Sequence, residues 1–265
     1  MDDGDRRWIE SMPTAYERGL VEPVFTPFAK EIAGRAATRH PARVLELAAG
    51  TGALTRELLS TLHGAAITAT DLSAEMVDLG RGNAPAATWQ PADAMDLPFE
   101  DNGFDLVTCA FGVMFVPDKR ACFAEVARVL DTHGSFLFAV WGRLEQHGFQ
   151  ACVVDAVHGI FPDDPPTFLE TVPHGYADTE VISADLNAAG FDTVEIETVT
   201  LPLVAETAAD VALGYCQGTP LRAQIEARGS LDDTTNAVAA ELARRFGGHP
   251  IRTSMAAIVV EAIPR

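Results

Sequence analysis

The chain has 265 residues, of which 48% are hydrophobic and 22% are charged. At roughly 150 residues per domain, this length fits one large domain with insertions. The composition excludes a disordered chain, a collagen-like chain and a small disulfide scaffold. The formal net charge of −19 excludes the basic surface with which nucleic-acid-binding proteins meet phosphates.

Targeting and redox features favour a cytoplasmic protein. No apolar run reaches the roughly 18 residues of a membrane span, and the start of the chain is acidic, unlike a secretory signal. The four cysteines stand far apart without a C-x-x-C pair, which is typical of reduced, buried thiols: they are Cys109, Cys122, Cys152 and Cys216. We therefore expect no disulfide, no metal site and no membrane span. The sequence leaves the oligomeric state open.

Residues 1–39 precede the first clear strand, and we expect them to form a helical segment. From residue 43, short apolar runs alternate with helical stretches, which favours a parallel sheet with helices on both faces. The expected strands are 43–49, 66–70, 87–90, 104–110 and 135–141. A helix over 53–62 follows the first strand, and residues 132–134 are expected to form a turn.

Two helix starts are marked by capping residues. Ser73 is expected to cap one helix, with Glu75 in its first turn and an apolar stripe of Met76, Val77 and Leu79. Asp118 is expected to cap the next helix, whose apolar stripe is Cys122, Phe123, Val126, Val129 and Leu130.

The alternation of strands and helices breaks at residue 143. A stretch rich in proline and phenylalanine follows, then a helix over 178–189 that ends at Gly190. The remaining expected elements are strands at 193–201 and 251–263 with a mainly helical stretch, 207–247, between them. We predict one domain over 1–265, with a ligand-binding core at 40–142. The insertions 143–178 and 203–247 are candidates for a lid.

The end of the first strand carries the strongest chemical signal. It reads Glu46-Leu-Ala-Ala-Gly-Thr-Gly52 and runs into a helix, so glycines allow close backbone approach and the helix start offers free N–H groups. Asp71 closes the next strand, where a carboxylate can accept hydrogen bonds from a ribose diol. This order is typical of the mononucleotide-binding half of a doubly wound sheet. Asp93 ends the third strand, and a carboxylate aimed at a cleft is costly to keep without a partner.

Five motifs stand in one characteristic order: Val44–Gly52, Thr70–Ser73, Ala92–Ala94, Phe104–Val107 and Glu125–Leu130. With them the chain resembles the class I S-adenosylmethionine-dependent methyltransferases, most of all the group that includes the ubiquinone and menaquinone C-methyltransferases. The resemblance covers about 40–142 well, the two later strands loosely and the insertions barely. It implies a doubly wound, seven-stranded Rossmann-like α/β sheet, mostly parallel with an antiparallel last strand, with helical lid insertions.

The resemblance also implies S-adenosylmethionine as cofactor and S-adenosylhomocysteine as product. The implied cofactor contacts are Glu46 and the loop Ala48, Ala49, Gly50, Thr51 and Gly52 for the methionine end; Asp71 for the ribose; Leu72, Met76, Asp93 and Ala94 for the adenine; and Ala110 and Phe111 for the floor. Met95 is a further predicted cofactor-binding residue. Ala48 stands where the commonest family pattern has glycine. We expect this alanine to keep a negative φ.

The implied reaction is in-line transfer of a methyl group to a small, apolar or aromatic molecule, with no nucleic acid as partner and no membrane span. Such a reaction needs positioning more than acid–base chemistry, so the catalytic residue is undetermined. Candidate bases are His147, His158, His174 and Tyr16, and candidate pocket residues are Phe115, Trp141 and Phe149.

Two alternatives stay open. A non-catalytic, S-adenosylmethionine-binding regulatory module would share the same motifs. A nicotinamide-dependent oxidoreductase is more remote, because no tyrosine is followed four residues later by lysine and only Gly50-Thr-Gly52 matches the dinucleotide glycine pattern.

Overall fold

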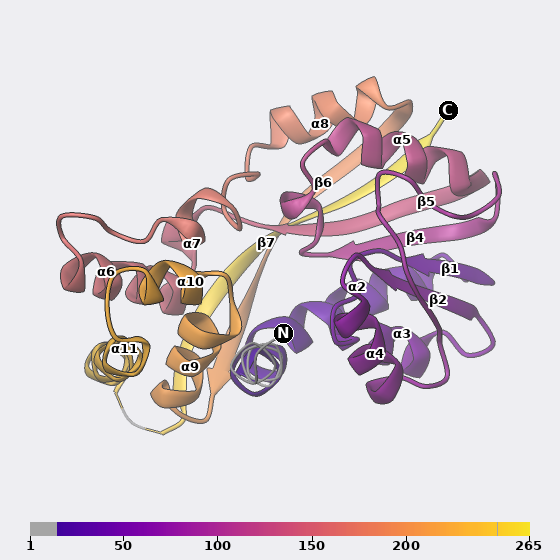
Figure 1. Ribbon diagram of the computed structural model, residues 1–265. Coiled ribbons are helices and arrows are strands. Elements are labelled where there is room, and N and C mark those ends of the chain that lie inside the picture. Colours follow the sequence, from indigo (N-terminus) through magenta and orange to yellow (C-terminus); the bar gives the residue numbers. More distant parts are fainter. Residues whose placement is uncertain (1–14, 248) are drawn as a thin grey trace. The chain divides into compact units, whose positions relative to one another are not determined.

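The computed structural model describes residues 15–247 and 249–265. The chain divides into two compact units (Figure 1). The sheet unit comprises Phe28–Trp141, Tyr176–Val199 and Ala257–Arg265. The helical unit comprises Gly142–Gly175, Thr200–Ala256 and, among its described N-terminal residues, 15–27. The two insertions predicted from sequence therefore fall almost entirely in the helical unit; their role as a lid stays a prediction.

The strands form one sheet in the order β3-β2-β1-β4-β5-β7-β6. Their bounds are β1(Arg43–Glu46), β2(Ala66–Asp71), β3(Thr88–Pro91), β4(Phe104–Ala110), β5(Leu130–Trp141), β6(Phe191–Ala205) and β7(Ile251–Pro264). β1 pairs with β2 and β4 in parallel, as do β2 with β3 and β4 with β5, whereas β5 and β7 are antiparallel. This confirms the predicted doubly wound fold. The order reverses between β1 and β4, so their carboxyl ends form the switch point where ligands of such sheets bind.

Helices cover both faces of the sheet (Figure 1). On one side lie α2(Thr26–Thr38), α3(Ala53–Thr61) and α4(Ala74–Asn83), and on the other lie α5(Lys119–Val129) and α8(Thr179–Ala188). Because both faces are covered, β5 is buried from Ser135 through Trp141. All four cysteines are free and buried, as predicted.

Both predicted helix caps are confirmed, but each predicted apolar stripe contains one residue that the structure places differently. The Ser73 hydroxyl accepts the Met76 N–H, and the Asp118 carboxylate accepts the Ala121 N–H. Leu79, however, is 42% exposed, because α4 turns Val77 and Gly80 inward instead. Leu130 belongs to β5 and not to the preceding helix.

The expected turn at 132–134 lies within β5. Phe104 pairs with Leu130 and Leu106 pairs with Ser135, so β5 carries extra residues that bulge out of the register. The Asp131 side chain accepts the His133 N–H and so stabilises this irregular stretch.

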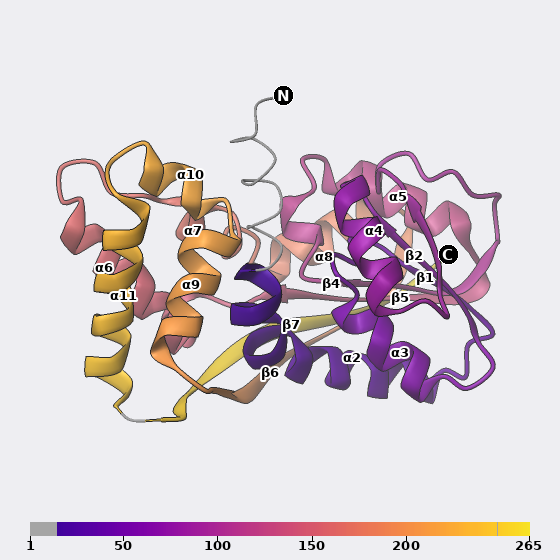
Figure 2. The same ribbon diagram turned by 60° about the horizontal axis from the view of Figure 1, so that its bottom comes forward.

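The helical unit is shown from a second side in Figure 2. Its elements are the π-helix η1(Glu17–Phe25), η3(Leu144–Gln146), α6(Gly148–Ile160), α7(Phe168–Thr171), α9(Ala208–Gly218), α10(Leu221–Glu226) and α11(Leu231–Phe246). Gly19 and Gly214 let η1 and α9 approach closely: a Cβ on Gly19 would lie 2.6 Å from the Gly214 Cα. Helices η1 and α2 lie within residues 1–39, the predicted N-terminal helical segment, of which residues 1–14 lie outside the described part. Within the described residues, no helix has the length and apolar character that crossing a membrane requires.

Candidate functional site

The glycine turn after β1, residues 48–52, is held from both sides. The Ala49 N–H donates to the Thr70 carbonyl (2.9 Å), and the Gly50 N–H donates to the Asp71 carboxylate (2.8 Å). The Asn83 side-chain amide, at the end of α4, donates to the Thr51 carbonyl (2.9 Å). Gly50 has a φ of +56° and a Cβ there would meet nothing within 4 Å, so this turn presents open backbone.

Ala48 corrects a prediction. Its φ is +50°, not negative. The turn requires a left-handed backbone conformation here whatever the side chain. For alanine this conformation is unfavourable by roughly 1–2 kcal/mol. Gly112 accommodates the Ala48 methyl group, because a Cβ on Gly112 would lie 2.4 Å from the Ala48 Cβ. The turn after β1 and the loop after β4 therefore touch directly.

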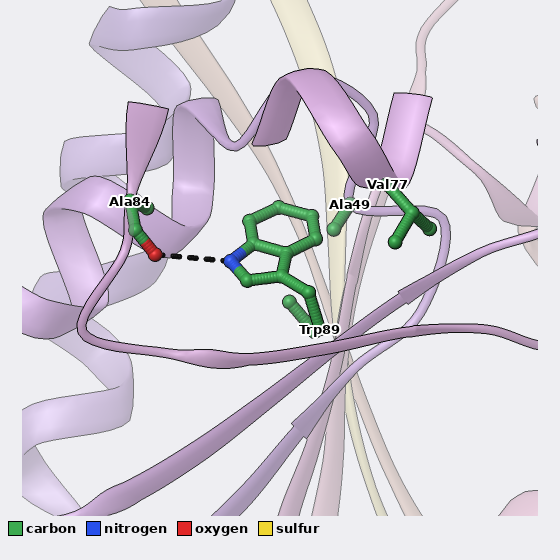
Figure 3. Packing of buried hydrophobic residues seen from close by; sticks show 5 residues of the cluster. Ala49, Val77, Ala84 and Trp89 are labelled. Atoms are coloured by element: carbon green, nitrogen blue, oxygen red, sulfur yellow. Dashed lines mark hydrogen bonds between the residues drawn. The ribbon is translucent and has the colours of Figure 1, made fainter. Parts of the chain in front are cut away.

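Trp89 packs beside Ala49, the residue that precedes Gly50 in the glycine turn (Figure 3). Its ring packs in a buried cluster with Ala49, Ala69, Val77 and Ala84, and its indole N–H donates to the Ala84 carbonyl (3.0 Å). A Cβ on Gly52 would lie 3.3 Å from this ring and one on Gly80 only 2.2 Å. Trp89 is absent from the site residues predicted from the sequence. The signal for it was Gly80, a glycine inside a predicted helix.

Glu46 is a buried carboxyl group at the end of β1, with 1% of its surface exposed. The Thr55 hydroxyl donates to its Oε2 atom (2.6 Å). Burial raises the pKa of Glu46 to about 8, the nearby Asp71 charge raises it further, and Thr55 and Arg56 oppose these effects. The group is therefore neutral at pH 7, and only an approaching positive charge would favour its ionised form.

Asp71 is committed to the backbone through both oxygens. Oδ2 accepts the Gly50 N–H (2.8 Å) and Oδ1 accepts the Ser73 N–H (3.0 Å). Each carboxylate oxygen has a further lone pair, so the group can still accept from a diol. Leu72, the next residue, is 75% exposed, and Met76 is half-buried. An apolar surface thus lies beside the carboxylate.

Asp93 organises the loop after β3. Its Oδ1 accepts the Met95 N–H (2.9 Å), and Ala94 and Met95 are half-buried. Further along, Arg128 of α5 donates to the Leu97 carbonyl (2.9 Å) and to the Phe99 carbonyl (2.7 Å). The Glu125–Leu130 motif therefore anchors this loop, a role that sequence reasoning did not assign.

Phe111, directly after the half-buried Ala110, has a φ of +59°. For a bulky side chain this is a strained conformation, of the kind that clusters at functional sites. The ring stacks on Trp141 with 3.5 Å between centroids, and Phe28 packs edge-on against both rings. Phe115, on the short helix η2(Val113–Phe115), is 51% exposed.

The three histidines predicted as candidate bases lie in the helical unit, and two of them are neighbours while the third lies in a different environment. The His147 and His174 rings lie 4.5 Å apart, and burial lowers the pKa of both, that of His147 to about 3. His158 instead pairs with Glu170 (3.1 Å).

The other two aromatic candidates of this unit make packing contacts. Tyr16 packs against Phe25. Phe149 is fully buried against Phe246 and belongs to the core of the unit. Among the described residues, no group of three or more His, Cys, Asp or Glu side chains could hold a metal ion.

Comparison with known proteins identifies the family. The model of a family described as a methyltransferase domain matches residues 45–138. A demethylmenaquinone methyltransferase of Clavibacter sepedonicus is 31% identical over 175 residues, which cover 62% of this chain and 71% of that protein. The chain belongs to the class I S-adenosylmethionine-dependent methyltransferases.

Two further matches agree. The ubiquinone/menaquinone biosynthesis C-methyltransferase UbiE of Stutzerimonas stutzeri is 29% identical and covers 71% of this methyltransferase and 78% of its own length. The YcgJ protein from Bacillus subtilis shares the fold, with a TM-score of 0.57 at 21% identity over 89% of this chain and 98% of that chain. The matches favour neither the regulatory module nor the oxidoreductase. The family match lies wholly within the sheet unit of the methyltransferase.

Proposed function

We propose that this methyltransferase transfers the methyl group of S-adenosylmethionine to a small apolar or aromatic molecule. The observation that carries the proposal is the open glycine turn, 48–52, flanked by the carboxyl groups of Glu46 and Asp71. The left-handed Gly50 presents open backbone there, and both carboxyl groups lie at the ends of adjacent parallel strands. In this proposal, residues 40–142 hold the cofactor.

The side chains present fit this cofactor. Glu46 is a buried acid with one hydroxyl partner, suited to an ammonium group. Asp71 keeps lone pairs for a ribose diol, and the exposed Leu72 offers an apolar face for adenine. Asp93 and Met95 would border the adenine amino group. When bound, the cofactor supplies a methyl group already activated on a positively charged sulfur.

The protein then has to position its reactants and exclude water. Correct alignment of two reacting groups can be worth roughly 7–11 kcal/mol. The glycine turn, 48–52, contributes by holding the cofactor in a fixed position. The packed, buried rings of Phe28, Phe111 and Trp141 exclude water from the neighbouring strand ends.

A small acceptor is supported by the relatives, whose names include ubiquinone/menaquinone C-methyltransferase, demethylmenaquinone methyltransferase and malonyl-[acyl-carrier protein] O-methyltransferase. We assign acceptor specificity to the helical unit, because the family match does not extend into it. The exposed ring of Phe115 is a candidate for acceptor contact.

Titration calorimetry with S-adenosylhomocysteine tests the cofactor proposal. We expect saturable binding by the full chain and at least a tenfold loss in Asp71→Ala. Asp131→Ala is a matched control, since Asp131 pairs with Arg43 at the opposite, amino end of β1. Absence of binding at high micromolar concentration would refute the proposed function. Equal binding by Asp71→Ala would refute the residue assignment alone.

A further inference from the structure

A group of polar side chains lies in the interior of the helical unit, at the first turn of α6. His147 and Gln150 are three residues apart and so share one face of this helix. The His174 ring lies 4.5 Å from the His147 ring and nearly edge-on to it. His147 is fully buried and Gln150 is 3% exposed. We call these three residues the His–Gln cluster.

The hydrogen bond of His174 fixes its tautomer. Its Nδ1 atom lies 2.6 Å from the Gly142 carbonyl oxygen. A carbonyl oxygen can only accept, so Nδ1 carries the hydrogen and Nε2 of the neutral ring carries a lone pair. This Nε2 atom is buried, and it has no hydrogen-bond partner among the described residues. His174 therefore offers a buried acceptor of fixed direction.

Gln150 supplies a second acceptor of the same kind. Its Oε1 atom is buried without a hydrogen-bond partner in the described part of the chain. Buried side-chain atoms in this condition occur only in the helical unit; the described residues of the sheet unit contain none. Because an unsatisfied buried acceptor is costly, its presence in a native structure points to a donor that it takes from outside the chain, such as a ligand or a bound water.

We propose that the His–Gln cluster is a ligand site of the helical unit, specific for a neutral molecule that donates a hydrogen bond from a hydroxyl or N–H group. The His174 Nε2 and Gln150 Oε1 atoms are both acceptors, and the His147 ring is engaged by a hydrogen bond to the Ala256 backbone. An ionised carboxylate or phosphate, which can only accept, therefore finds no donor in these two atoms.

A cation is also disfavoured. The burial that lowers the pKa of His147 and His174 shows that positive charge is costly here. Glu145 opposes this effect at His174 without reversing it. The identification of this ligand as the methyl acceptor rests on the proposed function, whereas the site itself does not.

Nitrogen NMR of the full chain, labelled with 15N in its histidines, tests the tautomer and the ligand class together. At pH 7 we expect His174 to be protonated on Nδ1 only. Phenol should then shift the His174 Nε2 signal in a saturable manner, whereas anisole, in which a methyl group replaces the donating hydrogen, should leave it unchanged. A proton on Nε2 in the free chain, equal shifts with both probes, or no shift with phenol would overturn the proposal.

Variants separate a ligand site from a structural one. Gln150→Met removes an unsatisfied acceptor at nearly constant size, so the melting temperature of the free chain should rise while phenol affinity falls about tenfold. His174→Asn should keep a donor for Gly142 and also lose about tenfold in phenol affinity. His158→Asn is the matched control and should retain affinity, since His158 pairs with Glu170. A lower melting temperature in Gln150→Met would mean that Oε1 already has a structural partner, which refutes the proposal.

The two proposals can fail separately. Phenol binding without S-adenosylhomocysteine binding would refute the proposed function and leave this site standing. S-adenosylhomocysteine binding without phenol binding would refute only this site.

Discussion

The raised pKa of Glu46 makes a quantitative prediction about stability. The folded state holds a proton on Glu46 up to about pH 8, whereas the unfolded chain releases it near 4.5. The stabilising contribution is therefore complete below pH 4.5 and is lost as the pH rises through 8. Its full size is up to about 5 kcal/mol, or about 1.4 kcal/mol for each pH unit between these values.

Replacing Glu46 with Gln removes this titration while keeping the size and the Thr55 contact. We expect the free energy of unfolding of the wild-type chain to fall relative to Glu46→Gln between pH 5 and 8, as measured by urea denaturation at each pH without ligand. Comparing the two chains cancels the titration of every other group. Glu100→Gln, an exposed control, should follow the wild type. A parallel pH dependence in wild type and Glu46→Gln would refute the reasoning.

The same group couples cofactor binding to protons. If the cofactor's ammonium group ionises Glu46, binding below pH 8 should release up to one proton. Calorimetry of S-adenosylhomocysteine in two buffers of different ionisation enthalpy measures this number directly. Glu46→Gln should abolish the release, and an unchanged release would show that another group supplies the proton.

Further predictions concern strain, packing and acid stability. Ala48→Gly should raise the free energy of unfolding by about 1 kcal/mol, because it relieves a left-handed alanine; a decrease in urea denaturation would contradict the assigned φ. Gly80→Ala should lower the free energy of unfolding by about 1–3 kcal/mol, because the new methyl group overpacks against Trp89. Gly34→Ala is the control: a Cβ there meets nothing within 4 Å, so it should raise the free energy of unfolding by up to about 1 kcal/mol. Equal effects of the two substitutions would refute the packing argument. Burial of His147 lowers its pKa to about 3, so its contribution is present above pH 6.5 and is lost as the pH falls; His147→Gln should flatten the acid limb of the pH–stability curve.

Local signals were enough to predict much of the sheet unit. Ser73, Asp118 and Asp178 were expected at helix starts and all three cap helices, because a cap depends only on residues a few positions away. The end of β2 at Asp71 follows from an apolar run bounded by a polar residue, whereas β1 ends at Glu46, three residues before the predicted end at residue 49. The seven-stranded topology itself came from the family resemblance and not from these patterns.

Features that depend on distant contacts could not be predicted. The left-handed Ala48 depends on the space left by Gly112, which lies beyond three other strands in sequence. Leu79 fits an apolar stripe as well as Val77 does, and only the position of Trp89 decides which side of α4 is buried. The pairing of His147 with His174 joins two ends of a proline-rich stretch that has no periodic pattern. The irregular start of β5 has the residues of a turn, and only its pairing with β4 makes it part of the strand.

The strand order has a consequence for synthesis of the protein on the ribosome. β7, the last of the seven strands in sequence, lies between β5 and β6 in the sheet. Until it emerges, the nascent chain exposes one backbone edge of β5, and β6 has no neighbour to join. Unpaired strand edges of this kind recruit other chains, so shielding by a chaperone should matter most in the interval before β7 joins the sheet.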